Sequence, residues 1–404
     1  MRELVKKAID PLKFFFNDSR STGILLLFCA IVSLTLSNSF DGSWYRSFWT
    51  SPIHYGGNIH LPHSNLKWIN DLLMAIFFFF AGMEIKRELL DGELAGFKKA
   101  ILPFGAALGG MIVPALIYVS INHGSSFVHG WGIPTATDIA FSLGIASLLG
   151  KRVPGSMKIF LMALAIIDDL GAIVVIALFY GSDINWIMLL YALFVYSLLW
   201  LCNYRNLKPG IVQLLLSFIL WYIIFNSGVE ASISGVLVAF AMPVNCLPKL
   251  ENAIHKTVNF IILPLFVLAN TAIMVPADLT AFNSPISLGV IMGLVIGKPV
   301  GIFLFSKIMI KLKIAKLPLN TNLKQLIGVG SLAGIGFTMS IFTTTLAFTG
   351  EINRDIAKIS ILASLVLSIL VSSVYFMILE TTKSVNPVIK KPQRRIYPNS
   401  IAIG

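Results

Sequence analysis

The sequence predicts an all-α membrane protein with about twelve transmembrane helices. Hydrophobic residues make up 56% of the 404 positions and charged residues only 12%, and the mean hydropathy is +0.83. Soluble domains do not carry such values. Apolar windows of about 20 residues, long enough to cross a bilayer with every backbone group bonded internally, recur along nearly the whole chain.

One transmembrane domain is expected over residues 21–382, between a basic segment at 1–20 and a basic tail at 383–404. The first segment is expected to lie as an amphipathic helix on the inner membrane surface, because no small-x-small cleavage site of a signal peptide follows it. The expected spans are residues 21–37, 69–85, 101–121, 134–149, 157–180, 185–202, 210–226, 229–245, 258–276, 286–306, 324–349 and 356–380.

Basic residues alternate between the connecting segments in a way that predicts orientation. With both termini in the cytoplasm, cytoplasmic segments hold 26 of the 31 Lys and Arg residues, as the tendency of short basic loops to stay inside requires. The outer side holds Arg46, Lys67, Arg354 and Lys358, and Lys298 falls within a span. The net charge of +12 is therefore a topology signal with affinity for anionic lipids, and it does not indicate nucleic-acid binding.

The long outer loop contains WTSPIHYGGNIHLPH, in which polar and apolar residues roughly alternate around Gly56 and Gly57. This pattern predicts a two-stranded hairpin over about residues 47–64. An isolated hairpin is only marginally stable in water, so it is expected either to pair with a second subunit in a homodimer or to serve as a simple cover. The three cysteines show no metal-ligand spacing, and no cofactor is predicted.

Four charged residues lie at membrane depth: Asp138, Lys298 and the adjacent pair Asp168 and Asp169 in LAIIDDLGAIVVIALFY. An unpaired charge there costs at least several kcal/mol, so such residues line a cavity or find a partner. Buried ion bridges that only hold helices together are the structural alternative. One lysine neutralises only one of three carboxylates, so the set favours an ion pathway.

Two spans carry residues that break helices. GIPTATDIAFSLG, residues 132–144, contains a proline and two threonines, and GVGSLAGIGFTMS, residues 328–340, is rich in glycine. Irregular backbone at membrane depth is tolerated only where it is buried or faces water. Both spans are therefore expected to be discontinuous, although glycines for close helix packing are an alternative for the second.

The two broken spans occupy matching places in the chain. They are the fourth and eleventh, each central in a group of three, and the groups 3–5 and 10–12 begin on opposite sides of the membrane. This arrangement is the inverted repeat of a secondary transporter, whose site lies where discontinuous helices cross near the midplane. There Asp138 suits the paired helix N-termini and Lys298 the paired C-termini.

Several motifs resemble the NhaA-type sodium/proton antiporters over roughly residues 15–380: IPTATDIAFSLG, LAIIDDLGAIVVIALFY, GLVIGKPVGI and WINDLLMAIFFFFAGMEIKREL. Members of that family are already known to contain inverted repeats, so the repeat in this chain is part of the resemblance and is not independent support for it. The resemblance implies a bacterial inner-membrane transporter, not an enzyme, that exchanges cytoplasmic Na+ or Li+ for external H+. It implies that Asp169 is the principal cation and proton ligand, that Asp168 beside it pairs with Lys298, and that Thr137 and Asp138 belong to the broken-helix assembly.

The resemblance also implies a response to pH. It places Asp71, Glu84, Arg87, Glu88 and Glu251 along or beside a cytoplasmic funnel. For Glu84, Arg87 and Glu88, a solvated helix end with neighbouring charge partners is the alternative. Where the family pattern has a histidine, this chain reads GVEAS with Glu230, which alters the expected pH window and leaves the transport residues in place.

The aspartate pair has a direct chemical interpretation. Na+ and Li+ are hard cations that prefer oxygen ligands, and a carboxylate in a narrow cavity binds one only after losing its proton. Competition between protons and a cation for one site is sufficient for exchange. Asp169 would take one proton and either Asp168 or Lys298 a second, which predicts electrogenic transport of two protons per Na+. A cation-coupled solute symporter would need a roomier polar site, and an intramembrane aspartyl protease would need carboxylates on facing helices.

Overall fold

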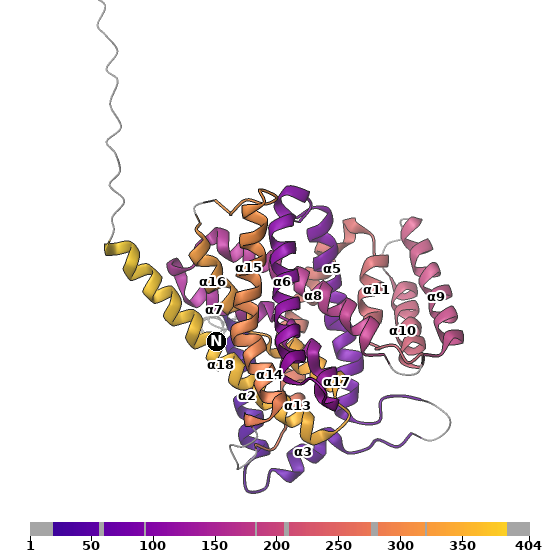
Figure 1. Cartoon of the computed structure of the whole chain (residues 1–404). Helices are drawn as coiled ribbons and strands as arrows, with labels where there is room; N and C mark the ends of the chain where they lie inside the picture. The colour runs from indigo at the N-terminus through magenta and orange to yellow at the C-terminus, as the bar shows by residue number, and fades with distance from the viewer. Residues whose placement is uncertain are drawn as a thin grey trace, which may run out of the picture.

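A computed structural model describes residues 19–55, 60–92, 94–181, 184–205, 210–275, 282–319 and 321–385. These residues form a bundle of helices (Figure 1), and no strand occurs among them. Seven helices of the described chain are long and apolar enough to cross a membrane, or eight if the bent pair α16 and α17 counts as one span. The all-α, multi-pass class is confirmed.

The first half of the chain runs from α2 to α9 (Figure 1). Its elements are α2 (Ser19–Ser37), α3 (Ser43–Thr50), α4 (Asn65–Trp68), η1 (Ile69–Leu73), α5 (Met74–Leu90), α6 (Phe97–Ile121), η2 (Ser126–Thr135), α7 (Ile139–Leu148), η3 (Gly150–Arg152), α8 (Gly155–Phe179) and α9 (Trp186–Tyr204).

The second half runs from α10 to α18. Its elements are α10 (Ile211–Phe225), α11 (Ile233–Ala241), η4 (Val244–Cys246), α12 (Leu247–Thr257), η5 (Val258–Ile262), α13 (Leu263–Asn270), α14 (Pro285–Met292), η7 (Gly293–Gly297), α15 (Lys298–Lys311), α16 (Leu323–Ala333), α17 (Phe337–Ala347) and α18 (Glu351–Val385). The segments η1, η5 and η7 are single π-helical turns inside longer helices.

Both spans that were expected to break are discontinuous. The 3₁₀ segment η2 ends at Thr135, the chain is extended at Ala136 and Asp138, and α7 begins at Ile139. Helices α16 and α17 are bent by 52° at a break over residues 334–336. The two breaks meet, because the Asp138 amide donates to the Ile335 carbonyl at 2.7 Å. These two backbone groups, which the breaks leave without helical partners, thereby satisfy each other in the membrane interior.

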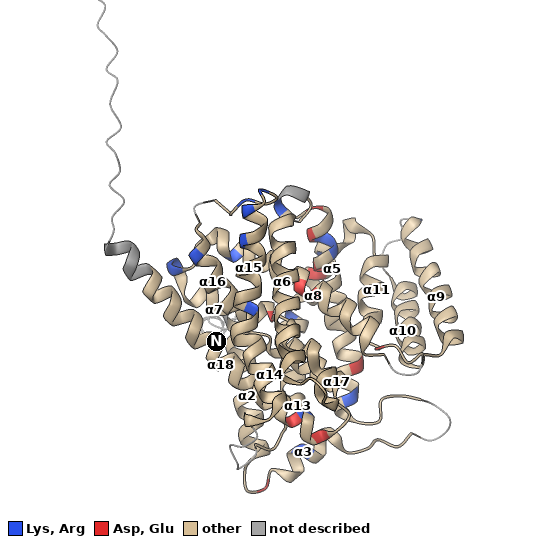
Figure 2. Cartoon of the chain, viewed as in Figure 1, with Lys and Arg blue, Asp and Glu red and all other residues tan. Residues whose placement is uncertain are grey.

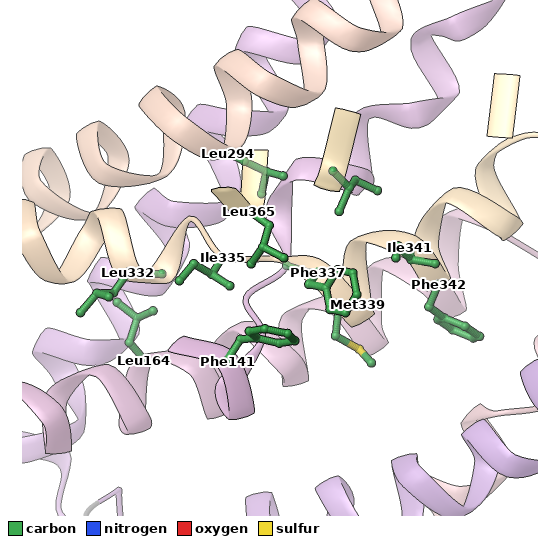
Figure 3. Close-up of a cluster of buried hydrophobic side chains, with 14 of the residues drawn as sticks. Phe141, Leu164, Leu294, Leu332, Ile335, Phe337, Met339, Ile341, Phe342 and Leu365 are labelled. Carbon is green, nitrogen blue, oxygen red and sulfur yellow. The ribbon is translucent and has the colours of Figure 1, made fainter. Parts of the chain in front are cut away.

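Apolar side chains pack closely around this crossing (Figure 3). Phe141 and Phe337, from the first turns of α7 and α17, meet edge to face with ring centroids 5.0 Å apart. Both are buried, as are Leu294 and Leu332 nearby. Such packing fixes the two half-helices relative to each other and so positions the polar groups on them.

Helices α5 and α11 pack in close contact because small residues line their interface. A Cβ added at Gly235 would lie 1.9 Å from the Ala75 carbonyl oxygen, so only glycine fits there. At one end, Lys86 Nζ donates to the carbonyls of Phe240 and Met242 at 2.8 and 2.5 Å. The ammonium group thus satisfies carbonyls that the end of α11 leaves without helical partners.

The loop over residues 47–64 differs in part from the expected hairpin. Residues 47–50 belong to α3, where Tyr45 and Trp49, four residues apart, are both buried on one face. The Ile53 amide donates to the His63 carbonyl at 2.7 Å, which brings the two arms of the loop together, while residues 56–59 lie outside the described chain. Most of the 1–20 segment and most of the 383–404 tail also lie outside it.

Most of the described Lys and Arg residues lie at one end of the bundle, around the ends of α5, α6, α15 and α16 (Figure 2). We refer to this end as the basic end.

Candidate ion-binding site

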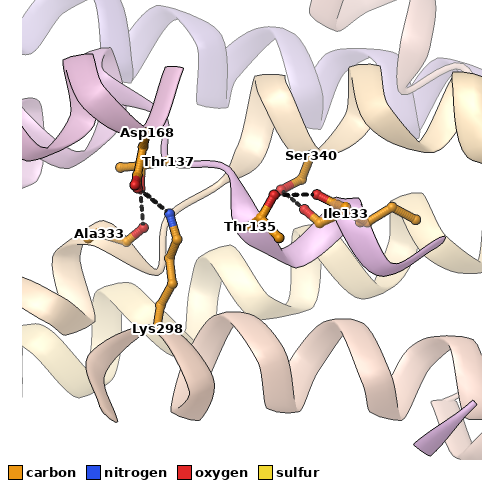
Figure 4. A network of polar contacts seen from close by, with 8 residues as sticks. Ile133, Thr135, Thr137, Asp168, Lys298, Ala333 and Ser340 are labelled. Atoms are coloured by element: carbon orange, nitrogen blue, oxygen red, sulfur yellow. Dashed lines mark hydrogen bonds and ion pairs between the residues drawn. The ribbon is translucent and has the colours of Figure 1, made fainter. Parts of the chain in front are cut away.

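Asp168 of α8 and Lys298 of α15 form a buried ion pair (Figure 4). Lys298 Nζ lies 2.6 Å from Asp168 Oδ2, and neither side chain is exposed. The Thr137 hydroxyl donates to the same carboxylate oxygen at 2.6 Å, lies 3.0 Å from the Ala333 carbonyl and also contacts Lys298 Nζ. Thr137 therefore connects Lys298 to the Ala333 carbonyl at the C-terminal end of α16.

Asp138 joins the beginnings of two half-helices. Its Oδ1 accepts from the Phe141 amide at 3.0 Å and caps α7, while its Oδ2 accepts from the Thr338 amide at 3.1 Å and from the Thr338 hydroxyl at 2.6 Å, at the start of α17. A negative charge at two helix N-termini is favourable because both carry partial positive charge. The carboxylate is only 4% exposed, so these bonds replace its hydration.

Asp169 faces a cavity of about 480 Å³, whereas Asp168 does not line it. Adjacent residues on a helix point about 100° apart, which lets one aspartate turn to the cavity and the other to Lys298. Asp169 Oδ1 is buried and has no hydrogen-bond partner among the described residues. The cavity is lined by Thr22, Phe77, Phe80, Ala81, Glu84, Thr137, Asp138, Ile139, Ala140, Leu143, Asp169, Asn252, His255, Lys256, Asn259, Phe260, Leu263, Thr338 and Met339.

The cavity extends from Asp169 towards the basic end, where further charged residues meet. Glu84 lines it directly. Arg87 lies one turn further along α5 and is 3.3 Å from both Glu88 and Glu251, so it links α5 to α12. The structure thus brings together four of the six residues expected to respond to pH.

Asp71 and Glu230 lie apart from that group, and neither lines the cavity. Asp71 is 13 residues before Glu84, about 20 Å along the helix, and its carbonyl accepts from Trp221 Nε1 at 3.0 Å. Glu230 precedes α11, in the connection from α10, and its Oε1 is buried without a partner among the described residues.

Sequence reasoning did not single out several polar residues of the cavity. Thr338 donates its hydroxyl to Asp138 at the crossing, and its place in the glycine-rich GVGSLAGIGFTMS stretch was the available signal. His255 and Asn259 are four residues apart and therefore share one face of the α12 and η5 helix, with a hydrogen bond of 3.0 Å between them. Neither was recognisable from composition, because polar residues at the end of a span are common.

Crossed broken helices, buried carboxylates with a single lysine, and a cavity leading to one aspartate define a secondary transporter of small cations. The chain belongs to the Na+/H+ antiporter 1 family, whose model matches residues 13–376. It is 45% identical over 393 residues to "Na(+)/H(+) antiporter NhaA 1" of Clostridium beijerinckii, covering 94% of this chain and 98% of that one. It is also 45% identical to "Na(+)/H(+) antiporter NhaA" of Citrobacter koseri, covering 88% and 94%. The expected family is confirmed, and its members are transporters, so the protein is not an enzyme.

Proposed function

We propose that this protein exchanges cytoplasmic Na+ or Li+ for external H+, with Asp169 as the principal ion and proton ligand and Asp168 as its partner. The family supports Na+/H+ exchange as the activity. The observation that carries the site assignment is the contrast between the two aspartates. Asp168 is neutralised by Lys298, whereas Asp169 faces the cavity with a buried oxygen that has no partner among the described residues.

Exchange follows from competition at one carboxylate. A deprotonated Asp169 offers the charged oxygen that a hard cation prefers, with Asp138, Thr137 and Thr338 on the same cavity wall as further oxygen donors. A protonated Asp169 offers no charge and releases the cation. If the site opens alternately to the two sides of the membrane, each cycle carries a cation one way and protons the other.

The same proposal includes a topology. Twelve spans with inverted groups 3–5 and 10–12 would place both broken helices at the centres of the two repeats. The concentration of basic residues at one end of the bundle supports a cytoplasmic basic end in a bacterial inner membrane, with both termini cytoplasmic. Anionic lipids would bind at that end, and the outer loop remains a candidate contact in a homodimer.

We further propose that transport is electrogenic and moves two protons inward for each Na+ expelled. When the cation leaves, Asp169 takes one proton. The second binds to whichever member of the Asp168 and Lys298 pair becomes free when that pair opens. The acidic and basic residues around Arg87 would adjust this exchange to pH.

The replacement Asp169→Asn tests the assignment. The amide can neither release a proton nor offer a charged oxygen, so the variant should show no Na+-induced or Li+-induced dequenching in acidified inside-out vesicles. Asp168→Asn should retain measurable exchange because its carboxylate pairs mainly with Lys298. Expression and thermal unfolding of both variants serve as controls for folding. Exchange near the wild-type rate in Asp169→Asn would remove Asp169 from the site.

A further inference from the structure

The polar residues of the cavity fall into two groups on different helices. Asp138, Asp169 and their threonine neighbours belong to the broken-helix crossing. Glu84 on α5 and the polar residues Asn252, His255, Lys256 and Asn259 on the helix formed by α12 and η5 line another part of the cavity, and Thr22 of α2 also lines it. We refer to Glu84, Asn252, His255 and Asn259 as the mouth site, because Asn252 and His255 are exposed whereas Asp169 is only 5% exposed.

Asn259 is oriented by a specific hydrogen bond. Its amide nitrogen lies 3.0 Å from His255 Nε2, and an amide nitrogen can only donate, so the ring nitrogen accepts. The Phe80 ring meets the His255 ring edge to face with centroids 5.8 Å apart, which fixes the imidazole from the α5 side. The Asn259 carbonyl oxygen takes no part in this bond.

The location of Asn259 argues against a purely structural pair. A hydrogen bond that only stabilises a helix can form between residues four apart on any exposed face. His255 and Asn259 instead both line the cavity that also contains Asp169. Asn259 also lies in the π-helical turn η5, and such turns are often found at functional sites. Glu84, on the facing helix, supplies a carboxylate to the same cavity.

We propose that the mouth site binds a partly hydrated Na+ or Li+ before the ion reaches Asp169, through the Glu84 carboxylate and the Asn259 carbonyl oxygen. Oxygen ligands of this kind suit hard monovalent cations, and an exposed site retains part of the hydration shell. His255 is a positioning residue that turns the Asn259 oxygen into the cavity. The inference rests on the proposed role of Asp169 as the inner site.

The replacement Asn259→Ala tests the mouth site through the two kinetic parameters of exchange in inside-out vesicles. Losing one neutral ligand should raise the apparent KM for Na+ and Li+ about three- to tenfold, or about 0.7 to 1.4 kcal/mol, with little change in the maximal rate. The matched control is Asn226→Ala, because that exposed amide bonds only the Tyr222 carbonyl of its own helix end. An unchanged KM in Asn259→Ala, or a fall in maximal rate alone, would overturn the proposal.

Substitutions of His255 separate positioning from packing. Gln at this place can still accept from the Asn259 amide, so His255→Gln should keep a KM close to that of wild type. Leu offers no acceptor, so His255→Leu should raise the KM as much as Asn259→Ala. Equal KM values for the two variants would mean that His255 does not orient the amide.

Salt dependence distinguishes a site from simple attraction of cations by surface charge. Raising ionic strength with choline chloride screens exposed charges. The KM increase in Glu84→Gln and Asn259→Ala should persist in high choline chloride, whereas a diffuse effect would disappear. If instead the assignment of Asp169 as the inner site were wrong, the Asp169→Asn variant would continue to exchange Na+ for H+. The mouth-site variants change only the Na+ concentration at which exchange is half-maximal.

Discussion

The Lys298 ammonium group lies 2.6 Å from the Asp168 carboxylate, and both side chains are completely buried. Removing two charges from water is costly, and their attraction recovers that cost only with good geometry and further hydrogen bonds. Here Thr137 supplies such a bond to the carboxylate. The pair thus links α8 to α15, and Thr137 links both to the first broken span, at the point where the two irregular segments cross.

Breaking this pair should destabilise the protein. Lys298→Ala leaves a buried carboxylate without its counter-charge, so we expect a loss of about 3–5 kcal/mol, measured as a lower midpoint of thermal unfolding in detergent. Lys298→Arg, which keeps the charge, should lose less. Adding Asp168→Asn to Lys298→Ala should restore part of the stability, because the uncompensated charge is gone. If the effects of the two single replacements simply add, the pair carries no interaction energy.

Asp138 should matter more than an ordinary helix cap. Asp138→Ala removes acceptors from the starts of both α7 and α17, so we expect a loss of about 2 kcal/mol or more, together with loss of exchange. Asn322→Ala provides the comparison, because the Asn322 side chain caps only α16, through the Gln325 amide at 3.0 Å. That variant should lose about 1 kcal/mol and retain exchange. Similar behaviour of the two variants would argue that Asp138 has no role beyond capping.

Electrogenic exchange can be tested without a pH gradient. Two protons against one monovalent cation move one net charge per cycle, so a potential of 100 mV contributes about 2.3 kcal/mol. In proteoliposomes with a potential set by K+ and valinomycin, an inside-negative potential should drive Na+ efflux to a new equilibrium, and reversing its sign should reverse the shift. One-for-one exchange would leave the equilibrium position of Na+ independent of potential.

Glu230 should lower the stability of the folded protein. Its Oε1 is buried without a hydrogen-bond partner among the described residues, and a buried polar oxygen without a partner is costly. Glu230→Gln has nearly the same shape and removes the charge, so we expect its midpoint of thermal unfolding in detergent to be equal to or higher than that of wild type. A clearly lower midpoint would show that the carboxylate makes a stabilising contact.

The sequence predicted the helical class and both broken spans, because long apolar windows and helix-breaking residues have few other solutions in a bilayer. It also brought Asp168, Asp169 and Lys298 into one hypothesis, since charges at membrane depth are rare. It did not predict that Asp71 lies near Glu230 or that Asn259 faces the cavity. Those positions depend on how helices rotate and pack against each other, which hydropathy does not encode. The helical conformation of residues 47–50, at the end of α3, depends likewise on burial of Tyr45 and Trp49 against the bundle.

The contact between α5 and α11 limits which parts of the protein can move. Glycine at position 235 brings the two backbones together, and Lys86 fastens the end of α11 to α5 through two carbonyls. If one helix slid along the other, the Phe240 and Met242 carbonyls would lose the Lys86 hydrogen bonds, and side chains with a Cβ atom would clash with the α5 backbone where only glycine fits. We therefore expect α5 and α11 to move as one rigid body, which includes Phe80 and Glu84 of α5. On the proposed function, we therefore expect access to Asp169 to change by relative displacement between that body and the crossed half-helices, across the cavity between them.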